Sequence, residues 1–273
     1  MKDRFYFQFN NKKLAYNIYG KSDGFPLLMH HGLVGSSDLS EEWREKADKA
    51  GVKIILPERP GYGQSDMIDL KDILSWAGIA GQLLESLAVK RFAVAGISAG
   101  APYAYTLAKQ YPEKVVGVWI ISGIPLVTDE RILSLYPEGH QRVYNHYKTA
   151  SVETIAEEYK KRLVSGKEKF SQASSLHKAM RLGIESNLKN GCLGIASEIK
   201  RQVRNWGFDP TKLTTKINLW HSMEDTEVPY PAVNRMVEKM NLAKLHIQKE
   251  PSHFASEQTI AELFDSIQQT VLP

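Results

Sequence analysis

Gly96-Ile97-Ser98-Ala99-Gly100 places a serine between two glycines, at the junction of two apolar segments. Residues 91–95 (RFAVA) predict a buried strand, and residues 101–108 (APYAYTLA) predict a helix. The pattern G-x-S-x-G at a strand-to-helix turn is typical of a nucleophile elbow. In so tight a turn, a side chain at Gly96 or Gly100 would collide with the strand or the helix. We therefore expect Ser98 to stand exposed at the carboxyl end of a sheet.

Two polar loops further along the chain supply an acid and a histidine. The predicted strand 217–221 precedes a loop with Glu224, Asp225 and Glu227, and the predicted strand 243–247 precedes a loop with His253. A serine hydroxyl becomes a nucleophile when an imidazole takes its proton, and a carboxylate orients that imidazole. The chain order serine, acid, histidine is one of the orders in which these three groups occur in hydrolases. From the residues alone, all three acids remain candidates.

Further motifs accompany these loops in a fixed order. They are the His31-Gly32 loop after the apolar run 26–30, the stretch 59–66 (RPGYGQSD), the elbow, His221 with Asp225 and Val228-Pro229, and Ser252-His253-Phe254. On these motifs the chain resembles the α/β-hydrolase superfamily over about residues 1–123 and 205–273. Ser222 stands where the acid loop of this superfamily usually has glycine. Ile97 stands where many lipases have histidine, which argues weakly against a lipase.

The resemblance implies an α/β-hydrolase fold, with a mostly parallel central sheet, helices on both faces and an inserted helical cap. It also implies a site in which Ser98 is the nucleophile, His253 the base and Asp225 the acid. The backbone N–H groups of Leu33 and Ala99 would form the oxyanion hole. The supporting loop residues would be His31, Gly32, Gly96 and Gly100, with His31 fixing its loop by hydrogen bonding.

The periodicity along the chain agrees with this architecture. Residues 5–9 and 14–19 predict an antiparallel hairpin, and the apolar strands 52–56 and 115–122 alternate with the helical patterns 41–50 and 70–87. Strands that alternate with helices and are apolar on both faces indicate a parallel sheet that is covered on both sides. We therefore assign 1–123 and 205–273 to the core.

Residues 124–204 break this alternation and are assigned to the cap, or lid. They carry the helical patterns 152–164 and 193–203, with fourteen Lys or Arg against nine Asp or Glu. We expect this lid to set specificity and to contribute little to the geometry of the catalytic groups. Its positive excess is interpreted as a solvated surface, with steering of an anionic substrate as the alternative.

Composition narrows the class of protein. A net charge of +4 on 273 residues, with no basic run interleaved with aromatics, gives no indication of nucleic-acid binding. The single cysteine, Cys192, excludes an internal disulfide and suits a reducing compartment. The sequence shows no signal-peptide pattern and no apolar run of about 20 residues for a membrane span. We therefore predict a cytoplasmic enzyme with a small-molecule substrate, and no pattern indicates an oligomeric state.

Other site interpretations are weaker. His30 and His31 would point to opposite faces of a strand, and His221 and Asp225 lie on a strand and a loop rather than on one helix, so no metal and no cofactor is expected. Cys192 is predicted to pack, since no base lies near it in sequence. Trp220 is predicted to lie in the core, whereas Phe254 fits the core or the pocket equally. The loop 59–65 is predicted to be mostly structural.

Two functions remain. The first is a cofactor-free serine hydrolase that cleaves a small ester, thioester, lactone or activated carbon–carbon bond through an acyl-enzyme on Ser98. The second is a ligand-binding regulator or receptor of the same fold with slow or vestigial hydrolysis. Haloalkane dehalogenases and epoxide hydrolases of this superfamily use an aspartate in place of Ser98. Proline iminopeptidases carry an acidic amine-binding motif in the cap, which residues 124–204 do not show.

Overall fold

One eight-stranded sheet forms the centre of the molecule, in a computed structural model that describes residues 4–166 and 174–271. The strand order is β1-β2-β4-β3-β5-β6-β7-β8. The strands are β1 (Phe5–Phe9), β2 (Lys12–Gly20), β3 (Phe25–His30), β4 (Val52–Pro57), β5 (Phe92–Ile97), β6 (Val115–Ile121), β7 (Ile217–Ser222) and β8 (Ala243–Gln248). The hairpin β1–β2 and the pair β2–β4 are antiparallel, and every other pairing is parallel.

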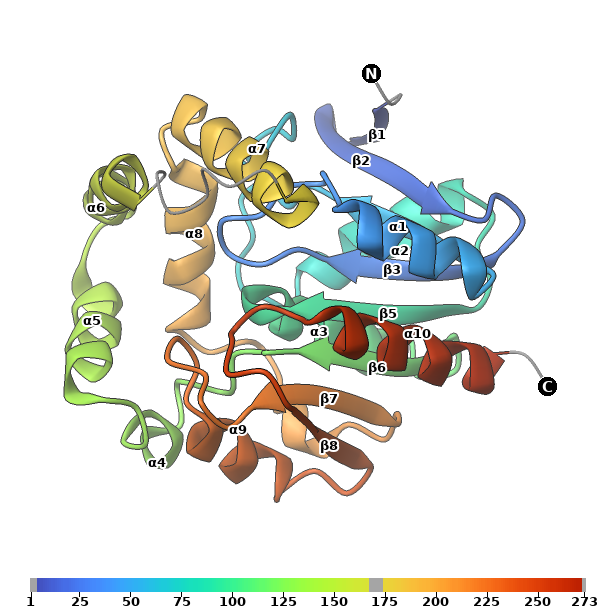
Figure 1. The fold of residues 1–273 in the computed structure, drawn as a ribbon. Helices are drawn as coiled ribbons and strands as arrows, with labels where there is room; N and C mark the ends of the chain where they lie inside the picture. Colours follow the sequence, from blue (N-terminus) through green and yellow to red (C-terminus); the bar gives the residue numbers. More distant parts are fainter. Residues whose placement is uncertain (1–3, 167–173, 272–273) are drawn as a thin grey trace.

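Helices cover both faces of this sheet. The bounds are α1 (Glu41–Lys49) and α10 (Glu257–Val271) on one face, and α2 (Trp76–Ser86), α3 (Ala101–Gln110) and α9 (Tyr230–Val237) on the other. In Figure 1, α1 and α10 lie in front of the sheet and α2 and α3 behind it. Along β4, Ile54 packs toward α1 and Ile55 toward α2, as the alternation of side chains in a strand requires. The predicted α/β-hydrolase fold, with a mostly parallel sheet covered on both sides, is confirmed.

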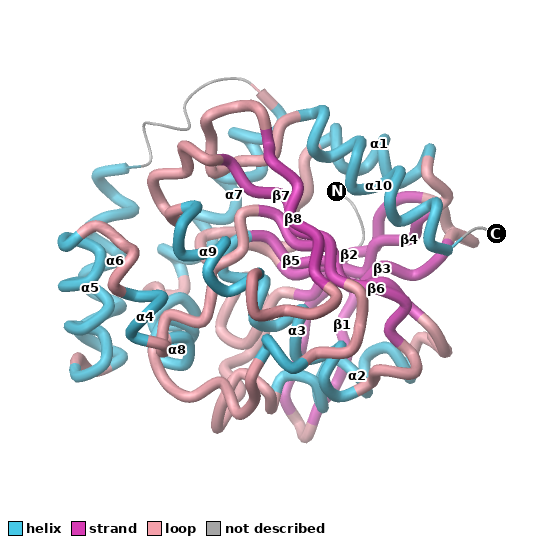
Figure 2. The backbone as a smooth tube through the Cα atoms, turned by 90° about the horizontal axis from the view of Figure 1, so that it is seen from below, coloured by secondary structure: helices cyan, strands magenta, loops and turns pink. Residues whose placement is uncertain are grey.

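Within the described ranges, five α-helices follow β6 before the chain returns to the sheet at β7. They are α4 (Glu130–Leu133), α5 (Glu138–Thr149), α6 (Val152–Gly166), α7 (Ser175–Lys189) and α8 (Leu193–Gln202). Figures 1 and 2 both place α5, α6 and α8 beyond one end of the sheet, and in Figure 1 this is the end at which β5 and β6 finish. Their apolar side chains form a separate buried cluster. The limits 124–204 stay a prediction, and residues 167–173 lie outside the described ranges.

The helix expected over 70–87 is shorter than its periodicity predicted. It begins at Trp76, because polar contacts hold the preceding residues in turns. Asp72 Oδ1 accepts hydrogen bonds from the backbone N–H and the hydroxyl of Ser75, at 2.8 and 2.6 Å. The N–H of Leu74 donates to the carbonyl of Trp206, 3.0 Å away and far along the chain. A side-chain acceptor and a tertiary hydrogen bond thus replace the first turns of the expected helix.

Within the described ranges, no helix is both long and apolar enough to cross a membrane.

Candidate active site

The turn at Ser98 has the geometry that its two glycines predict. Ser98 has φ +51°, in the left-handed region that non-glycine residues rarely occupy. A Cβ on Gly96 would lie 2.7 Å from the carbonyl oxygen of Gly100, and one on Gly100 would lie 2.4 Å from that of His30. Both distances are shorter than any real contact of this kind, so only glycine fits at the two positions. The backbone strain at Ser98 is held in place by the buried strand β5 before it and helix α3 after it.

His253 lies between Ser98 and Asp225. Its Nε2 is 2.9 Å from Ser98 Oγ, and its Nδ1 is 2.8 Å from Asp225 Oδ2. A carboxylate only accepts hydrogen bonds, so Nδ1 carries the proton and Nε2 is left to accept the hydroxyl proton of Ser98. The three side chains come from the ends of β5, β7 and β8 and are brought together although up to 155 residues separate them. This is the arrangement that a general-base-activated nucleophile needs.

Backbone hydrogen bonds fix the carboxylate oxygen of Asp225 that does not contact His253. Its Oδ1 accepts hydrogen bonds from the N–H groups of Glu227 and Val228, at 2.9 and 3.0 Å. Burial alone would raise the pKa of the Asp225 carboxyl, but hydrogen bonding to His253 and to Val228 N–H outweighs it and holds that pKa below its ordinary value. His221, buried beside it, donates from Nε2 to the carbonyl of Val228 at 2.7 Å and so fixes the loop.

Glu224 and Glu227, the two other candidate acids, are exposed. Glu227 pairs with Arg162 across 3.8 Å, while Asp225 Oδ2 is the carboxylate oxygen bonded to the imidazole of His253. The geometry therefore favours Asp225 over both glutamates.

The lowered pKa of Asp225 predicts a pH-dependent contribution to stability. A carboxyl whose pKa is lower in the folded state stabilises the protein at pH values above its unfolded pKa, about 3.9. That contribution is lost as the pH falls through the folded pKa. The free energy of unfolding of the wild type should therefore fall more steeply between about pH 5 and pH 2 than that of Asp225→Asn. Urea titrations at several pH values measure both slopes, and parallel curves would contradict the assignment.

The loop after β3 reaches the elbow at Gly32. A Cβ built on Gly32 would lie 3.6 Å from the Cβ of Ser98, so the loop backbone borders the nucleophile. The carbonyl oxygen of Gly32 accepts hydrogen bonds from His31 Nδ1 at 2.8 Å and from Gly35 N–H at 3.1 Å. The C=O and N–H of one trans peptide unit point in opposite directions. Two bonds to the Gly32 carbonyl therefore fix the direction of the Leu33 N–H.

Ala99 N–H is fixed in the same way. Its peptide partner, the carbonyl of Ser98, accepts hydrogen bonds from Ile124 N–H at 3.2 Å and from Ala101 N–H. Both predicted oxyanion donors thus belong to peptide units whose carbonyls are held by other groups. Such donors need no reorientation when charge develops on a substrate oxygen, which is what makes an oxyanion hole effective.

His31 has the surroundings of a supporting residue. It is buried against Tyr62, with ring centroids 4.7 Å apart. Burial and the nearby Arg59 hold the pKa of His31 well below its ordinary value, so the ring is neutral. Its Nδ1–H donates to the carbonyl of Gly32, which agrees with the expectation that it fixes this loop.

The structure also shows where Trp220, Phe254 and Cys192 lie. Trp220 is buried, stacks on His246 at 4.4 Å and donates to Glu262, so it belongs to the core, as predicted. Phe254 is 39% exposed and packs edge-on against His253, so it borders the site. Cys192 is buried in the cluster formed by the cap helices, and burial raises the pKa of its thiol. Cys192 therefore packs, as predicted.

The cap supplies two side chains to the site that sequence reasoning missed. Glu198 and Gln202, on α8, are buried and contact groups that hold the elbow and the His31-Gly32 loop. These contacts reach the carbonyl of Ala99 directly and that of His31 through Arg59, while the expectation that residues 124–204 contribute little to the geometry of the catalytic triad stays a prediction. Glu198 and Gln202 are four apart on a predicted helix and so share one face. That spacing was the signal in the sequence, but nothing local showed that this face meets the elbow.

Four of the cap's positive charges pair with carboxylates in the described part of the chain. Arg131 pairs with Asp129, Arg142 with Glu138, Lys160 with Glu157 and Arg162 with Glu227. Lys200 donates to three backbone carbonyls at the end of α5. Lys167 and Lys169 lie outside the described ranges. The solvated surface and its alternative, the steering of an anionic substrate, therefore both stay predictions. In the same ranges, no group of three or more His, Cys, Asp or Glu side chains is placed to hold a metal ion.

Comparison with known proteins identifies a family for most of this chain. Residues 26–254 match the family described as alpha/beta hydrolase fold. The chain is 36% identical over 108 residues to an uncharacterized hydrolase, YcgS, of Bacillus subtilis, a match that covers 39% of this chain and 37% of that protein. It is 22% identical over 249 residues to a 2-hydroxy-6-oxo-6-phenylhexa-2,4-dienoate hydrolase of Comamonas testosteroni, covering 89% of this chain and 85% of that protein.

Solved structures show the same architecture. An esterase from Exiguobacterium antarcticum superposes with a TM-score of 0.73 at 17% sequence identity, over 98% of this chain and 100% of the other. The family match extends from β3 to the loop that carries His253, and so includes every predicted site residue. The expectation of an enzyme of the hydrolase class is confirmed by these comparisons. The chain belongs to the alpha/beta hydrolase fold family.

Proposed function

We propose that the protein is a serine hydrolase that works through an acyl-enzyme on Ser98. The observation that carries this proposal is the continuous chain of hydrogen bonds from Ser98 Oγ through His253 to Asp225, at 2.9 and 2.8 Å. Donor and acceptor directions along this chain leave the Nε2 of His253 free to take the hydroxyl proton. The oxyanion donors would be the N–H groups of Leu33 and Ala99.

In the first half of the reaction, Ser98 Oγ forms a bond to the substrate carbonyl carbon while its proton passes to His253 Nε2. The carbonyl π electrons move to oxygen, and the two backbone N–H groups stabilise the resulting oxyanion. Asp225 stabilises the imidazolium that has formed. When the carbonyl re-forms, the bond to the leaving group breaks and His253 returns the proton to that group. The product of this half is an ester of Ser98.

Water then hydrolyses the ester of Ser98, with water as the nucleophile and Ser98 Oγ as the leaving group. His253 Nε2 takes a proton from water as the oxygen attacks the acyl carbon, and the second oxyanion occupies the same donors. Collapse of this intermediate breaks the bond to Ser98 Oγ, which regains its proton from His253. The acid product then leaves, and no external cofactor enters the balance.

We propose a small ester, thioester, lactone or activated carbon–carbon bond as the substrate. The names of two similar proteins support this choice, since one relative in sequence is a 2-hydroxy-6-oxo-6-phenylhexa-2,4-dienoate hydrolase and one neighbour in fold is an esterase. The partly buried apolar side chains of Leu33 and Val34 pack with the cap cluster, which gives the loop beside Ser98 an apolar surface. We retain the cap at 124–204 and a cytoplasmic location as predictions.

A screen of chromogenic esters of increasing acyl length, with thioesters and lactones included, tests this proposal. We expect many turnovers per protein molecule on at least one substrate class. A fast initial release of chromophore close to one equivalent should precede the steady state when deacylation is slow. Binding of these compounds without sustained turnover would contradict the proposal and would support the ligand-binding regulator instead.

A further inference from the structure

We propose that α8 of the cap, with Arg59, positions both backbone donors of the oxyanion hole. Glu198 would act on one donor through Arg59, and Gln202 would act on the other directly. The proposal rests on the proposed function, because it names residues that hold the same site. It concerns positioning residues only, since none of the three side chains is placed against the reacting atoms.

Arg59 holds the end of β3. Its Nη1 donates to the carbonyl oxygen of His31 at 2.8 Å, and its side chain is 1% exposed. The carbonyl of His31 starts the backbone segment that leads through Gly32 to the Leu33 N–H. A Cβ on Gly100 would lie 2.8 Å from the same carbonyl oxygen, so the backbone of the elbow packs closely against it. Arg59 therefore fixes the point where the oxyanion loop and the elbow meet.

Glu198 fixes Arg59. Arg59 Nε donates to one oxygen of the Glu198 carboxylate at 2.6 Å and Arg59 Nη2 to the other at 2.9 Å, and the Glu198 side chain is fully buried. The guanidinium also lies over the rings of Tyr62 and Tyr103, 5.3 and 4.8 Å from their centroids. A guanidinium group that makes two hydrogen bonds to one carboxylate and lies between two rings has a single orientation. A lysine could not make both hydrogen bonds in this geometry.

Gln202 lies one helical turn after Glu198 and reaches the elbow. Its Nε2 donates to the carbonyl oxygen of Ala99 at 3.2 Å and contacts Glu198 Oε1 at 3.3 Å. The carbonyl of Ala99 belongs to the peptide unit that follows the one carrying the Ala99 N–H. One face of α8 thus holds both arms of the oxyanion hole, through residues spaced by one turn.

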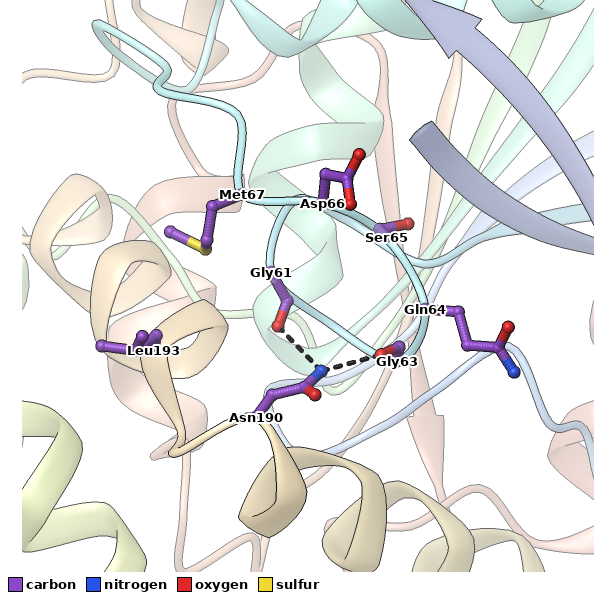
Figure 3. Close-up of a pocket in the computed structure, with 8 residues that line it drawn as sticks. All are labelled: Gly61, Gly63, Gln64, Ser65, Asp66, Met67, Asn190 and Leu193. Atoms are coloured by element: carbon purple, nitrogen blue, oxygen red, sulfur yellow. Dashed lines mark hydrogen bonds between the residues drawn. The ribbon is translucent and has the colours of Figure 1, made fainter. Parts of the chain in front are cut away.

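Close backbone packing fixes the position of α8 on the core. A Cβ on Gly194 would lie 2.6 Å from the carbonyl oxygen of Gly61, so the first turn of α8 rests directly on the loop that follows Arg59. At the turn before α8, the amide of Asn190 donates to the carbonyl of Gly63 at 2.7 Å and contacts that of Gly61 at 3.5 Å (Figure 3). These contacts border a cavity of about 370 Å³ and anchor α8 to the core.

This network is better explained by positioning than by stability. Burying an ion pair costs much of what its attraction returns, and apolar residues of similar size often serve the fold equally well. An apolar pair in place of Arg59 and Glu198 would, however, leave the His31 carbonyl without its donor. The charges are therefore explained by the direction that they impose on the oxyanion loop.

Gln202→Leu tests the arm at Ala99, since leucine fills a similar volume and cannot donate. We expect kcat on a chromogenic ester to fall by about 10- to 100-fold with KM within a factor of two, as for a misaligned catalytic group. The affinity for phenylboronic acid, whose serine adduct places an oxygen in the oxyanion hole, should fall in parallel with kcat/KM. The matched control is Lys200→Met, on the same helix, whose three hydrogen bonds go to α5 instead. It should lower the melting temperature and leave kcat and boronate affinity within twofold.

The double variant Arg59→Met/Glu198→Leu tests the other arm, and it removes both members of the buried ion pair together. We expect a loss of kcat and of boronate affinity at least as large as for Gln202→Leu. If Gln202→Leu and the double variant both hydrolyse the ester and bind the boronate within twofold of the wild type, the positioning proposal is overturned. If the wild type itself neither hydrolyses the ester nor binds the boronate, it is the proposed function that fails.

Discussion

Replacing Ser98 with alanine should lower kcat by roughly 10⁴- to 10⁶-fold on any substrate that the wild type turns over. The reason is that Ser98 Oγ is the hydroxyl bonded to the imidazole of His253, at 2.9 Å, and its loss removes the covalent route. Steady-state rates at saturating ester give the ratio of the two kcat values, with the wild type diluted until its rate falls in the range measured for the variant. The residual rate should come from substrate binding and the oxyanion donors alone.

Two comparisons show whether this loss is specific. Ser98→Ala/His253→Ala should retain about the same residual rate as Ser98→Ala, because groups that act as one unit are not additive. Ser86→Ala, on α2 with its hydroxyl bonded to a carbonyl within that helix, controls for the loss of a serine elsewhere and should leave kcat unchanged. A double variant that is slower than Ser98→Ala by another large factor would show that His253 acts independently of Ser98.

Asp225→Asn should lower kcat by about 10⁴-fold, the size of the effect of the same change in a serine protease triad. Asp225 Oδ2 accepts the Nδ1 proton of His253 at 2.8 Å and thereby leaves Nε2 free to take the serine proton. An amide in its place presents an N–H or a poorer acceptor and favours the wrong tautomer. Stopped-flow or steady-state rates on the best ester of the screen measure the effect.

Glu224→Gln and Glu227→Gln are the matched controls for Asp225→Asn, since they neutralise the neighbouring acids of the same loop. Both side chains are exposed, and we expect both variants to keep kcat within a factor of two or three, as for ordinary surface substitutions. An almost silent Asp225→Asn, together with a severe loss in either glutamate variant, would move the acid to that glutamate.

The elbow and the order of the site residues could be predicted from the sequence because their requirements are local. The glycines at 96 and 100 report a steric limit within one turn, and the structure shows the close contacts that they avoid. Asp225 and His253 each follow a strand, and parallel strands end at the same edge of a sheet, so their meeting with Ser98 follows from the topology.

The start of α2 and the part played by α8 could not be predicted, because each depends on contacts between distant residues. Leu74 bonds to Trp206 at 3.0 Å, which ends the helical pattern that the local sequence favours. Arg59 and Glu198 are 139 residues apart, and their pairing depends on how the cap docks on the core. In the sequence, Glu198 and Gln202 fit the solvent-exposed polar face of an amphipathic helix, although both are buried in the structure.

Mapping the covalent adduct of a fluorophosphonate or sulfonyl-fluoride probe by peptide mass spectrometry tests directly whether Ser98 is the nucleophile. We expect one adduct per molecule, on Ser98, and no adduct in Ser98→Ala. Labelling should also be slowed strongly in Asp225→Asn, since the same imidazole activates the serine toward the probe. An adduct on Cys192 or on another serine, with Ser98 unmodified, would show that Ser98 is not the nucleophile.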